Sequence, residues 1–247
     1  ATIVLKRGKK EADDGILLPD GEMMKDLGDE GYKYLGVLEA SEIKTKEMKE
    51  KVRSEYTRRV KLLLESKLNG GNVIKAINTW AVAVLRYSGG ILDWTQDELK
   101  CIDRKTRKLM TINRALHPRA NVARLYLPRN EGGRGLRSAE ETVRTEEHGL
   151  SDYIRCEEKG SNRLLKKLIK EKTKREYQEN QRATKEKEWK EKALHGQYTK
   201  IADKTDRKKT YKWMKNGYMK KETEGLITAA QDQALPTRWR KVNIEKQ

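Results

Sequence analysis

Residues 73–98 read "VIKAINTWAVAVLRYSGGILDWTQDE", and this stretch carries the strongest structural signal in the chain. Its first fifteen residues are apolar on nearly every side, which is typical of a buried helix. The two glycines after Ser88 indicate the end of that helix. Thr95 and Glu98 have the spacing of a capping box, in which each side chain accepts a hydrogen bond from the other residue's backbone, so another helix starts there. We therefore predict a helical bundle around a central helix at 73–87.

Two further helices flank the central one in the predicted bundle. Before it, apolar residues recur at three- and four-residue steps and form a helical stripe: Met48, Val52, Tyr56, Val60, Leu63, Leu64 and Leu68. The run "NGGN" at 69–72 is expected to stop that helix. After the central helix, the helix that starts at Thr95 is expected to bury Leu99, Ile102 and Leu109. The opposite faces of both flanking helices are basic, with Lys49, Arg53, Arg58, Lys61, Arg104, Lys105, Arg107 and Lys108.

The sequence predicts four regions along the chain. Residues 1–40 hold two β-rich runs, "TIVLK" and "YKYLGVLEA", which we expect to pair as two strands joined by a Gly/Pro/Asp-rich loop. Residues 41–115 form the bundle, and 116–150 form a connector with a capped helix near Ser138. Residues 151–247 are strongly basic, which predicts a long exposed helix or a partly disordered arm. The predicted fold is mainly α, with a short N-terminal β-hairpin, a three-helix bundle and a long basic helical extension.

The composition points to a polyanionic partner. The 247 residues have a net charge of +18, and only 35% of them are hydrophobic. This excess of positive charge favours nucleic acid ahead of an anionic membrane surface. The alternative is a lysine-rich helical protein whose charge only keeps it in solution. No apolar run reaches transmembrane length, and the widely separated Cys101 and Cys156 favour reduced thiols in an intracellular compartment, the cytoplasm or the nucleus.

No pattern in the chain predicts a catalytic residue, a metal ligand or a cofactor site. The run "EADD" at 11–14 looks like the paired carboxylates that bind Mg²⁺, but it lies in a Gly/Pro-rich loop, so a solvated turn is favoured. The run "EGGRG" at 131–135 predicts a sharp turn rather than a phosphate-binding loop. The three histidines lack the spacing of metal ligands or of a catalytic triad.

Aromatic residues alternate with basic ones near the C-terminus. The run "DRKKTYKWMKNGYMKK" at 206–221 contains seven basic residues, and "RWR" follows at 238–240. Basic side chains neutralise phosphates, and aromatic rings stack on unpaired bases. The candidate binding residues are Lys208, Lys209, Tyr211, Lys212, Trp213, Arg238, Trp239 and Arg240. An equally weighted alternative is a short amphipathic helix whose aromatic side chains dock on the rest of the protein.

Four segments resemble one family, in the order that the family has them. "ATIVLKRGK" and "YKYLGV" resemble the end of the palm in reverse transcriptases of non-LTR (LINE-type) retrotransposons. Residues 72–110 are similar to the thumb of those polymerases, and "LHPRANVARLYLPRNEGGRGL" at 116–136 is similar to the segment after it. "EGLITAAQDQALPTRW" at 224–239 resembles the stretch that precedes a cysteine/histidine zinc knuckle.

The resemblance implies a role for two sets of residues. Tyr34, Leu35 and Gly36 map to the primer grip, and the basic faces of 44–61 and 104–108 map to the thumb surface that holds the template–primer duplex. The family's catalytic aspartates would precede Ala1, so this chain alone is expected to show no polymerase activity, and Mg²⁺ is expected only for the intact polymerase. The implied partners are RNA, DNA or an RNA–DNA hybrid, and also the other half of the polymerase.

A second hypothesis is a retroelement remnant reused as a helical structural or interaction protein, or as an assembly subunit. In that case the chain would associate with itself or with another helical protein. The residues expected to form the contact are Leu164, Leu165, Leu168 and Ile169.

Overall fold

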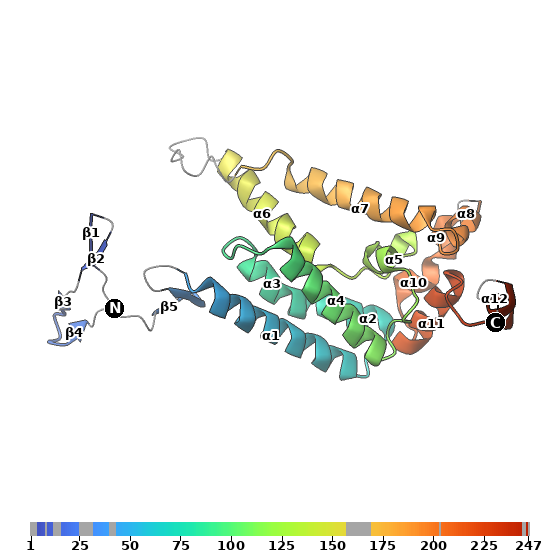
Figure 1. The fold of residues 1–247 in the computed structure, drawn as a ribbon, viewed down its shortest axis with the longest axis horizontal. Helices are drawn as coiled ribbons and strands as arrows, with labels where there is room; N and C mark the ends of the chain where they lie inside the picture. The colour runs from blue at the N-terminus through green and yellow to red at the C-terminus, as the bar shows by residue number, and fades with distance from the viewer. Residues whose placement is uncertain are drawn as a thin grey trace. The chain divides into compact units, whose positions relative to one another are not determined.

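The computed structural model describes residues 4–7, 9–11, 16–24, 32–39, 43–156, 169–202, 204–243 and 246. The fold is mainly α with short β-hairpins, as predicted, and the chain divides into two units, Ala1–Val52 and Arg53–Gln247 (Figure 1). None of the described helices is both long enough and apolar enough to cross a lipid bilayer.

The first unit contains three separate antiparallel hairpins. They pair β1 (Val4–Lys6) with β2 (Lys9–Glu11), β3 (Ile16–Leu17) with β4 (Met23–Met24), and β5 (Tyr32–Tyr34) with β6 (Val37–Glu39). The prediction that the two β-rich runs pair with each other is therefore wrong. Leu35 and Gly36 both have positive φ angles, 46° and 88°, as the tightest hairpin turns require, so "YKY" pairs with the residues that directly follow it.

The three predicted helices are present. Helix α1 (Thr45–Glu65) begins in the first unit and continues into the second. The central helix consists of α2 (Gly70–Ala76), a π-helical turn η1 (Ile77–Ala81) and α3 (Val82–Gly89), which follow one another without a break. Helix α4 (Gln96–Ile112) starts at the capping box of Thr95 and Glu98, which is confirmed.

Two details of the bundle differ from the prediction. Helix α1 already ends at Glu65, and Asn69 caps the start of α2 by accepting a hydrogen bond from the Asn72 amide, so "NGGN" starts a helix instead of ending one. The central helix is buried along one side and not all round. Its buried residues include Val73, Ile74, Ile77, Ala81, Val82 and Leu85, whereas Trp80 and Tyr87 are exposed.

The remaining helices complete the second unit. They are α5 (Val122–Tyr126), the 3₁₀ turn η2 (Arg129–Glu131), α6 (Ala139–Cys156), α7 (Lys174–Glu191), α8 (Gln197–Ala202), α9 (Arg207–Thr210), α10 (Lys212–Asn216), α11 (Lys221–Gln231) and α12 (Arg238–Asn243). Helix α6 packs on α3 and α4, and α7 packs along α6 and α5 (Figure 1).

The packing of α7 differs from the exposed or partly disordered arm that the sequence suggested. Trp189 is buried and forms a small core with Ala123 and Leu127 of the connector. The guanidinium of Arg124 lies 4.8 Å from the centre of the Trp189 ring. This tryptophan, the cation–π contact and the ion pair of Lys185 with Glu141 of α6 thus help to attach a helix that is mostly polar.

Candidate nucleic-acid interface

Helix α4 presents basic side chains to solvent on the side opposite its core contacts. Leu99, Ile102, Thr106 and Met110 are buried, whereas Arg104, Lys105 and Lys108 are exposed. No hydrogen bond or ion pair joins these three cations to any residue that the structure describes. Arg107, the fourth predicted residue of this helix, is half-buried, and its Nη1 donates to Tyr126 Oη at 2.8 Å. Three uncompensated charges therefore remain on α4.

Helix α1 lies beside α4 and adds one uncompensated charge. Tyr56 Oη and Thr106 Oγ1 share a buried hydrogen bond of 3.0 Å that joins the two helices. Lys61 is exposed and has no partner among the described residues. Of the other predicted residues of α1, Lys49 is half-buried in the part that belongs to the first unit, and Arg53 Nη2 lies 3.7 Å from Glu98 Oε1.

The charge of Arg58 is already neutralised within α1. Its Nε and Nη2 donate to the two carboxylate oxygens of Glu55 at 2.7 and 2.9 Å. Hydrogen bonds from Arg58 and then from Arg59 lower the pKa of Glu55 to about 2. The candidate interface therefore consists of Lys61, Arg104, Lys105 and Lys108, which we call the α1–α4 basic face.

Asp103 fixes α4 against α6 from inside the unit. Its carboxylate oxygens accept hydrogen bonds from the backbone amides of Ala139 at 2.7 Å and Glu140 at 3.3 Å, at the start of α6. Burial raises the pKa of Asp103 to about 6, although these two hydrogen bonds act in the opposite direction. The orientation of α4, and with it the direction of the basic face, thus depends on a buried acid.

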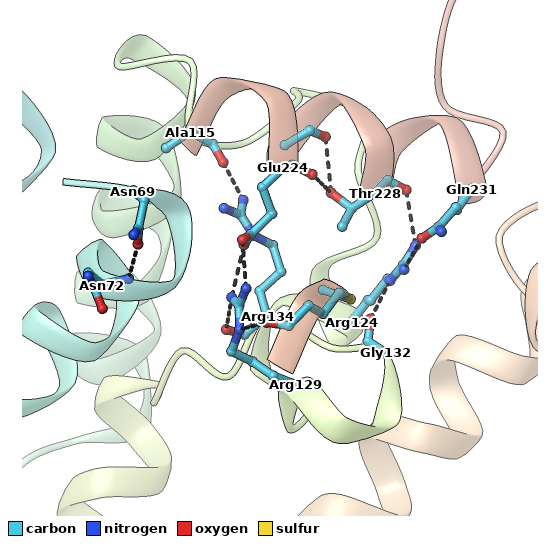
Figure 2. Close-up of polar contacts among 12 residues, drawn as sticks. Asn69, Asn72, Ala115, Arg124, Arg129, Gly132, Arg134, Glu224, Thr228 and Gln231 are labelled. Carbon is cyan, nitrogen blue, oxygen red and sulfur yellow. Dashed lines mark hydrogen bonds and ion pairs between the residues drawn. The ribbon is translucent and has the colours of Figure 1, made fainter. Parts of the chain in front are cut away.

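Two buried arginines, Arg124 and Arg134, and the half-buried Arg129 join the connector to the C-terminal helices. Arg124 Nη1 donates to Asp232 Oδ1 at 2.8 Å and to the Thr228 carbonyl at 3.0 Å, and Arg124 Nε donates to the Gly132 carbonyl at 2.8 Å. Figure 2 shows Arg124 reaching from the connector to the carbonyl of Thr228 on α11. Arg124 Nη2 donates to Gln231 Oε1, so each nitrogen of the guanidinium has an acceptor, as a buried charge requires.

Glu224 of α11 is shared by the other two arginines. Arg129 donates to both of its carboxylate oxygens at 2.9 and 2.6 Å, and Arg134 Nε donates at 3.0 Å (Figure 2). Arg134 also donates to the Ala115 carbonyl, and burial lowers its pKa. Burial alone would raise the pKa of Glu224, but the hydrogen bond from Arg129 and the charges of Arg134 and Arg129 hold it below its usual value. Glu224 therefore carries its negative charge at neutral pH.

Glycines bring α2 directly against this network. A Cβ on Gly70 would lie 2.6 Å from Glu224 Oε2, and a Cβ on Gly71 would lie 2.9 Å from the Cα of Gly217. The Gly70 amide donates to the Met219 carbonyl at 2.8 Å. The bundle, the connector and α11 thus approach one another closely at glycines. The segments at 116–136 and 224–239 both belong to the second unit.

Two of the three aromatic residues of 206–221, Tyr211 and Trp213, do not present a stacking surface. Tyr211 is buried against Met214, and a Cβ on Gly132 would lie 2.5 Å from its ring, so the ring has no free face for a base. Trp213 is half-buried and packs on the same cluster. Tyr211 and Trp213 therefore dock on the rest of the protein, as the alternative interpretation expected, whereas Tyr218 is exposed.

The basic residues around them are mostly exposed. Lys208, Lys209 and Lys212 face solvent, and Lys209 Nζ lies 4.0 Å from Asp206 Oδ2. Arg238 is exposed, whereas Arg240 Nη1 donates to the Gln233 carbonyl. The side chain of Trp239 lies outside the described part of the chain. These cations lie on or next to short helices, and Tyr218 in the same run is 82% exposed.

Other predicted residues lie apart from the α1–α4 basic face or outside the described ranges. Leu35 and Gly36 form the exposed tip of the β5–β6 hairpin in the first unit, and the side chain of Tyr34 is not described. Asp13 and Asp14 of "EADD", and also Leu164, Leu165 and Leu168, lie outside the described residues. Within the described ranges, no group of three or more His, Cys, Asp or Glu side chains is arranged to hold a metal ion.

Sequence reasoning missed the buried ion pairs. A signal was present, because three arginines interrupt the apolar pattern of 121–136, and Glu224 and Asp232 bracket the otherwise weakly polar run of α11. Comparison of the chain with protein-family models, with curated proteins and with solved structures finds no match in any of the three. The family resemblance therefore stays a prediction.

Proposed function

We propose that this chain is the part of a LINE-type reverse transcriptase that holds duplex nucleic acid, and that it does so through phosphates on the α1–α4 basic face. The observation that carries the proposal is that Arg104, Lys105 and Lys108 are exposed and have no partner among the described residues. Cations in this state neutralise phosphates at little cost in lost ion pairs. The family resemblance supports the same region, because residues 104–108 correspond to the thumb.

The mechanism is electrostatic and independent of base sequence. Helix α4 rises about 1.5 Å per residue, so residues 104–108 extend over about 6 Å. A duplex carries about one charge per 1.7 Å of its axis, so several phosphates come within reach of this stretch and of Lys61. Phosphate contacts position a duplex without reading its sequence. RNA, DNA and hybrid duplexes are therefore all expected to bind.

Duplex binding at two salt concentrations tests the proposal. If four phosphates are neutralised, the affinity for a 20-base-pair duplex falls about a hundredfold between 50 and 200 mM salt. The triple variant R104A/K105A/K108A should bind more weakly at 50 mM salt and lose only about fourfold over the same range. Fluorescence anisotropy with a labelled duplex measures both affinities.

A matched variant controls for the loss of net charge. K67A/K75A/K220A also removes three exposed lysines that have no partner in the described ranges, but none of them lies on α4 or on α1. This control should keep the wild-type affinity within about threefold and keep the wild-type salt dependence. Equal losses in the two triple variants would show that only the overall charge matters and would refute the proposed face.

A further inference from the structure

An open groove of about 420 Å³ on the second unit shares no lining residue with the α1–α4 basic face. It is lined by Arg86 of α3, by Arg137 and the first turns of α6, and by Lys174 and Gln178 of α7. None of these residues belongs to α1 or α4. Its chemistry is thus independent of the proposed duplex contact.

The groove has more positive than negative charge. Glu146 is shared by two cations, since its carboxylate oxygens lie 3.1 Å from Arg86 Nε and 3.9 Å from Lys174 Nζ. Glu141, the other acid of the lining, forms an ion pair with Lys185. The exposed side chain of Arg137 has no hydrogen bond or ion pair with any residue of the described ranges. Three cations thus face one carboxylate that is not neutralised elsewhere.

A buried hydroxyl in the same groove lacks a partner. Thr145 is 7% exposed and lines the groove, and its Oγ1 has no hydrogen-bond partner within the described structure. One turn earlier on α6, Thr142 Oγ1 donates to the Ser138 carbonyl at 2.7 Å. An unsatisfied buried hydroxyl is unfavourable, and a ligand that accepts its hydrogen bond would remove this penalty.

Hydrogen bonds fix the main chain at Arg137. Asn78, in the π-helical turn η1, accepts from the Arg137 amide at 2.9 Å and donates to the Gly135 carbonyl at 2.7 Å. Gly149 leaves room for Lys174 to cross α6, because a Cβ at this position would lie 3.3 Å from Lys174 Nζ. Glycine within a helix lowers the stability of that helix relative to alanine. Gly149 thus gives the space that Lys174 occupies, although it lowers the stability of α6.

We propose that this groove binds a phosphate group. A phosphate accepts several charge-assisted hydrogen bonds at once, and its donors here would be Arg137, Arg86, Lys174, the Thr145 hydroxyl and the Gln178 amide. A phosphate with nearly two negative charges matches the excess of two cations. Inorganic phosphate, a nucleotide and a nucleic-acid backbone share this chemistry, and the experiment distinguishes among them.

Titration of the full chain with inorganic phosphate, at constant ionic strength balanced with chloride, tests the proposal by calorimetry. The wild type should bind saturably. Arg137→Ala should weaken binding at least about tenfold, because it removes a charged donor. Lys75→Ala, which removes an exposed lysine of α2 outside the groove, should leave the phosphate affinity unchanged. Absence of saturable binding, or equal effects of these two variants, would overturn the proposal.

Thr145→Val separates a ligand role from a structural one. The two side chains have nearly the same shape, and the hydroxyl has no partner, so the variant should unfold at the same temperature as the wild type or higher without phosphate. Its phosphate affinity should fall about tenfold. A variant that is less stable without phosphate, or that binds phosphate as tightly as the wild type, would contradict the proposed site.

The source of the phosphate follows from two parallel titrations. If Arg137→Ala also weakens duplex binding at 50 mM salt, the groove takes a backbone phosphate of the nucleic acid. If the variant keeps its duplex affinity but loses affinity for adenosine monophosphate, the groove takes a small phosphorylated ligand. If R104A/K105A/K108A binds the duplex as tightly as the wild type does, only the proposed function is refuted. The groove proposal would stand, since the groove shares no residue with the α1–α4 basic face.

Discussion

Glu224→Gln removes the negative charge that Arg129 and Arg134 share, and it changes the shape of the side chain very little. Glu224 and Arg134 are about as buried as any side chains in the chain, at 1% and 2% exposed, and Arg129 retains 17% side-chain exposure. After the substitution, two guanidinium groups keep their charge inside the protein with only neutral acceptors nearby. Water cannot solvate Arg134, so the penalty falls on the folded state.

The expected loss is a large part of the stability of the unit. Breaking a buried ion pair by removal of one partner costs about 3–5 kcal/mol, compared with a total of about 5–15 kcal/mol for a typical domain. For a unit of this size each kcal/mol lowers Tm by about 2–4 °C, so we expect a decrease of about 6–20 °C. Urea denaturation followed by tryptophan fluorescence and circular dichroism measures the free energy of unfolding.

Glu222→Gln is the matched control, because Glu222 lies on the same helix but is 42% exposed at the side chain, 3.8 Å from Lys221. It should change the free energy of unfolding by less than about 1 kcal/mol. A second arm adds Arg134→Met to Glu224→Gln, and this double variant should be less destabilised than the sum of the single variants. Equal losses for Glu224→Gln and Glu222→Gln would refute the role of the buried network.

The pH dependence provides an independent check of the same ion pairs. The pKa of Glu224 is held below its usual value in the folded state. Its contribution to folding stability is therefore fully present at a pH above the pKa that Glu224 has in the unfolded chain. This contribution is lost as the pH falls through the lowered folded-state pKa. Glu224→Gln should therefore flatten the loss of stability in acid that the wild type shows.

Three further predictions concern the elements around the interface. The pKa of Asp103 is raised to about 6 in the folded state, so its contribution to stability decreases as the pH rises from the pKa of the unfolded state to about 6. Asp103→Asn should abolish this pH dependence when the free energy of unfolding is measured between pH 4 and 7. Gly71→Ala places a Cβ 2.9 Å from Gly217 Cα and should lower the free energy of unfolding in urea by about 1–3 kcal/mol. Gly90→Ala is the control and should be nearly neutral, because the atom nearest to its Cβ would be 3.9 Å away. Similar effects of the two variants would contradict the close approach of Gly71 and Gly217. Tyr211→Ala should lower the free energy of unfolding by about 3–5 kcal/mol, because the ring is buried. At a temperature where the variant is folded, its duplex affinity should equal that of the wild type. A loss of duplex affinity in the folded variant would instead support a stacking role for Tyr211.

Local signals in the sequence predicted the helices well because their causes are local. Thr95 and Glu98 cap α4 through atoms three residues apart, and that spacing is visible in the sequence. The glycines after Ser88 end α3 for a similar reason. The basic residues of α4 were predicted to face solvent because the apolar positions of the same helix set its orientation.

Contacts between distant residues explain what the sequence could not predict. Gly70 and Gly71 resemble a helix stop, but they are glycines because Glu224 and Gly217 approach them from about 150 residues away in the chain. Strand β5 (Tyr32–Tyr34) pairs with β6, the next strand along the chain, because the tight turn at Leu35 and Gly36 connects these two strands directly.

Buried arginines were overlooked for a different reason. Arginine is mostly a surface residue, so Arg124 and Arg134 were not candidates for the core. Their burial depends on Asp232 and Glu224, which lie in a region that composition assigned to a basic arm. The same contacts explain why that region is folded, because the acids of α11 and Trp189 of α7 both attach to the connector.

The slope of log affinity against log salt for a short duplex tests the central claim most directly. The wild type should have a slope of about −3.5, since four uncompensated cations each neutralise one phosphate, and R104A/K105A/K108A should have a slope of about −1. The control K67A/K75A/K220A should retain the wild-type slope. If R104A/K105A/K108A also retained it, the α1–α4 basic face would not be the surface that holds the duplex.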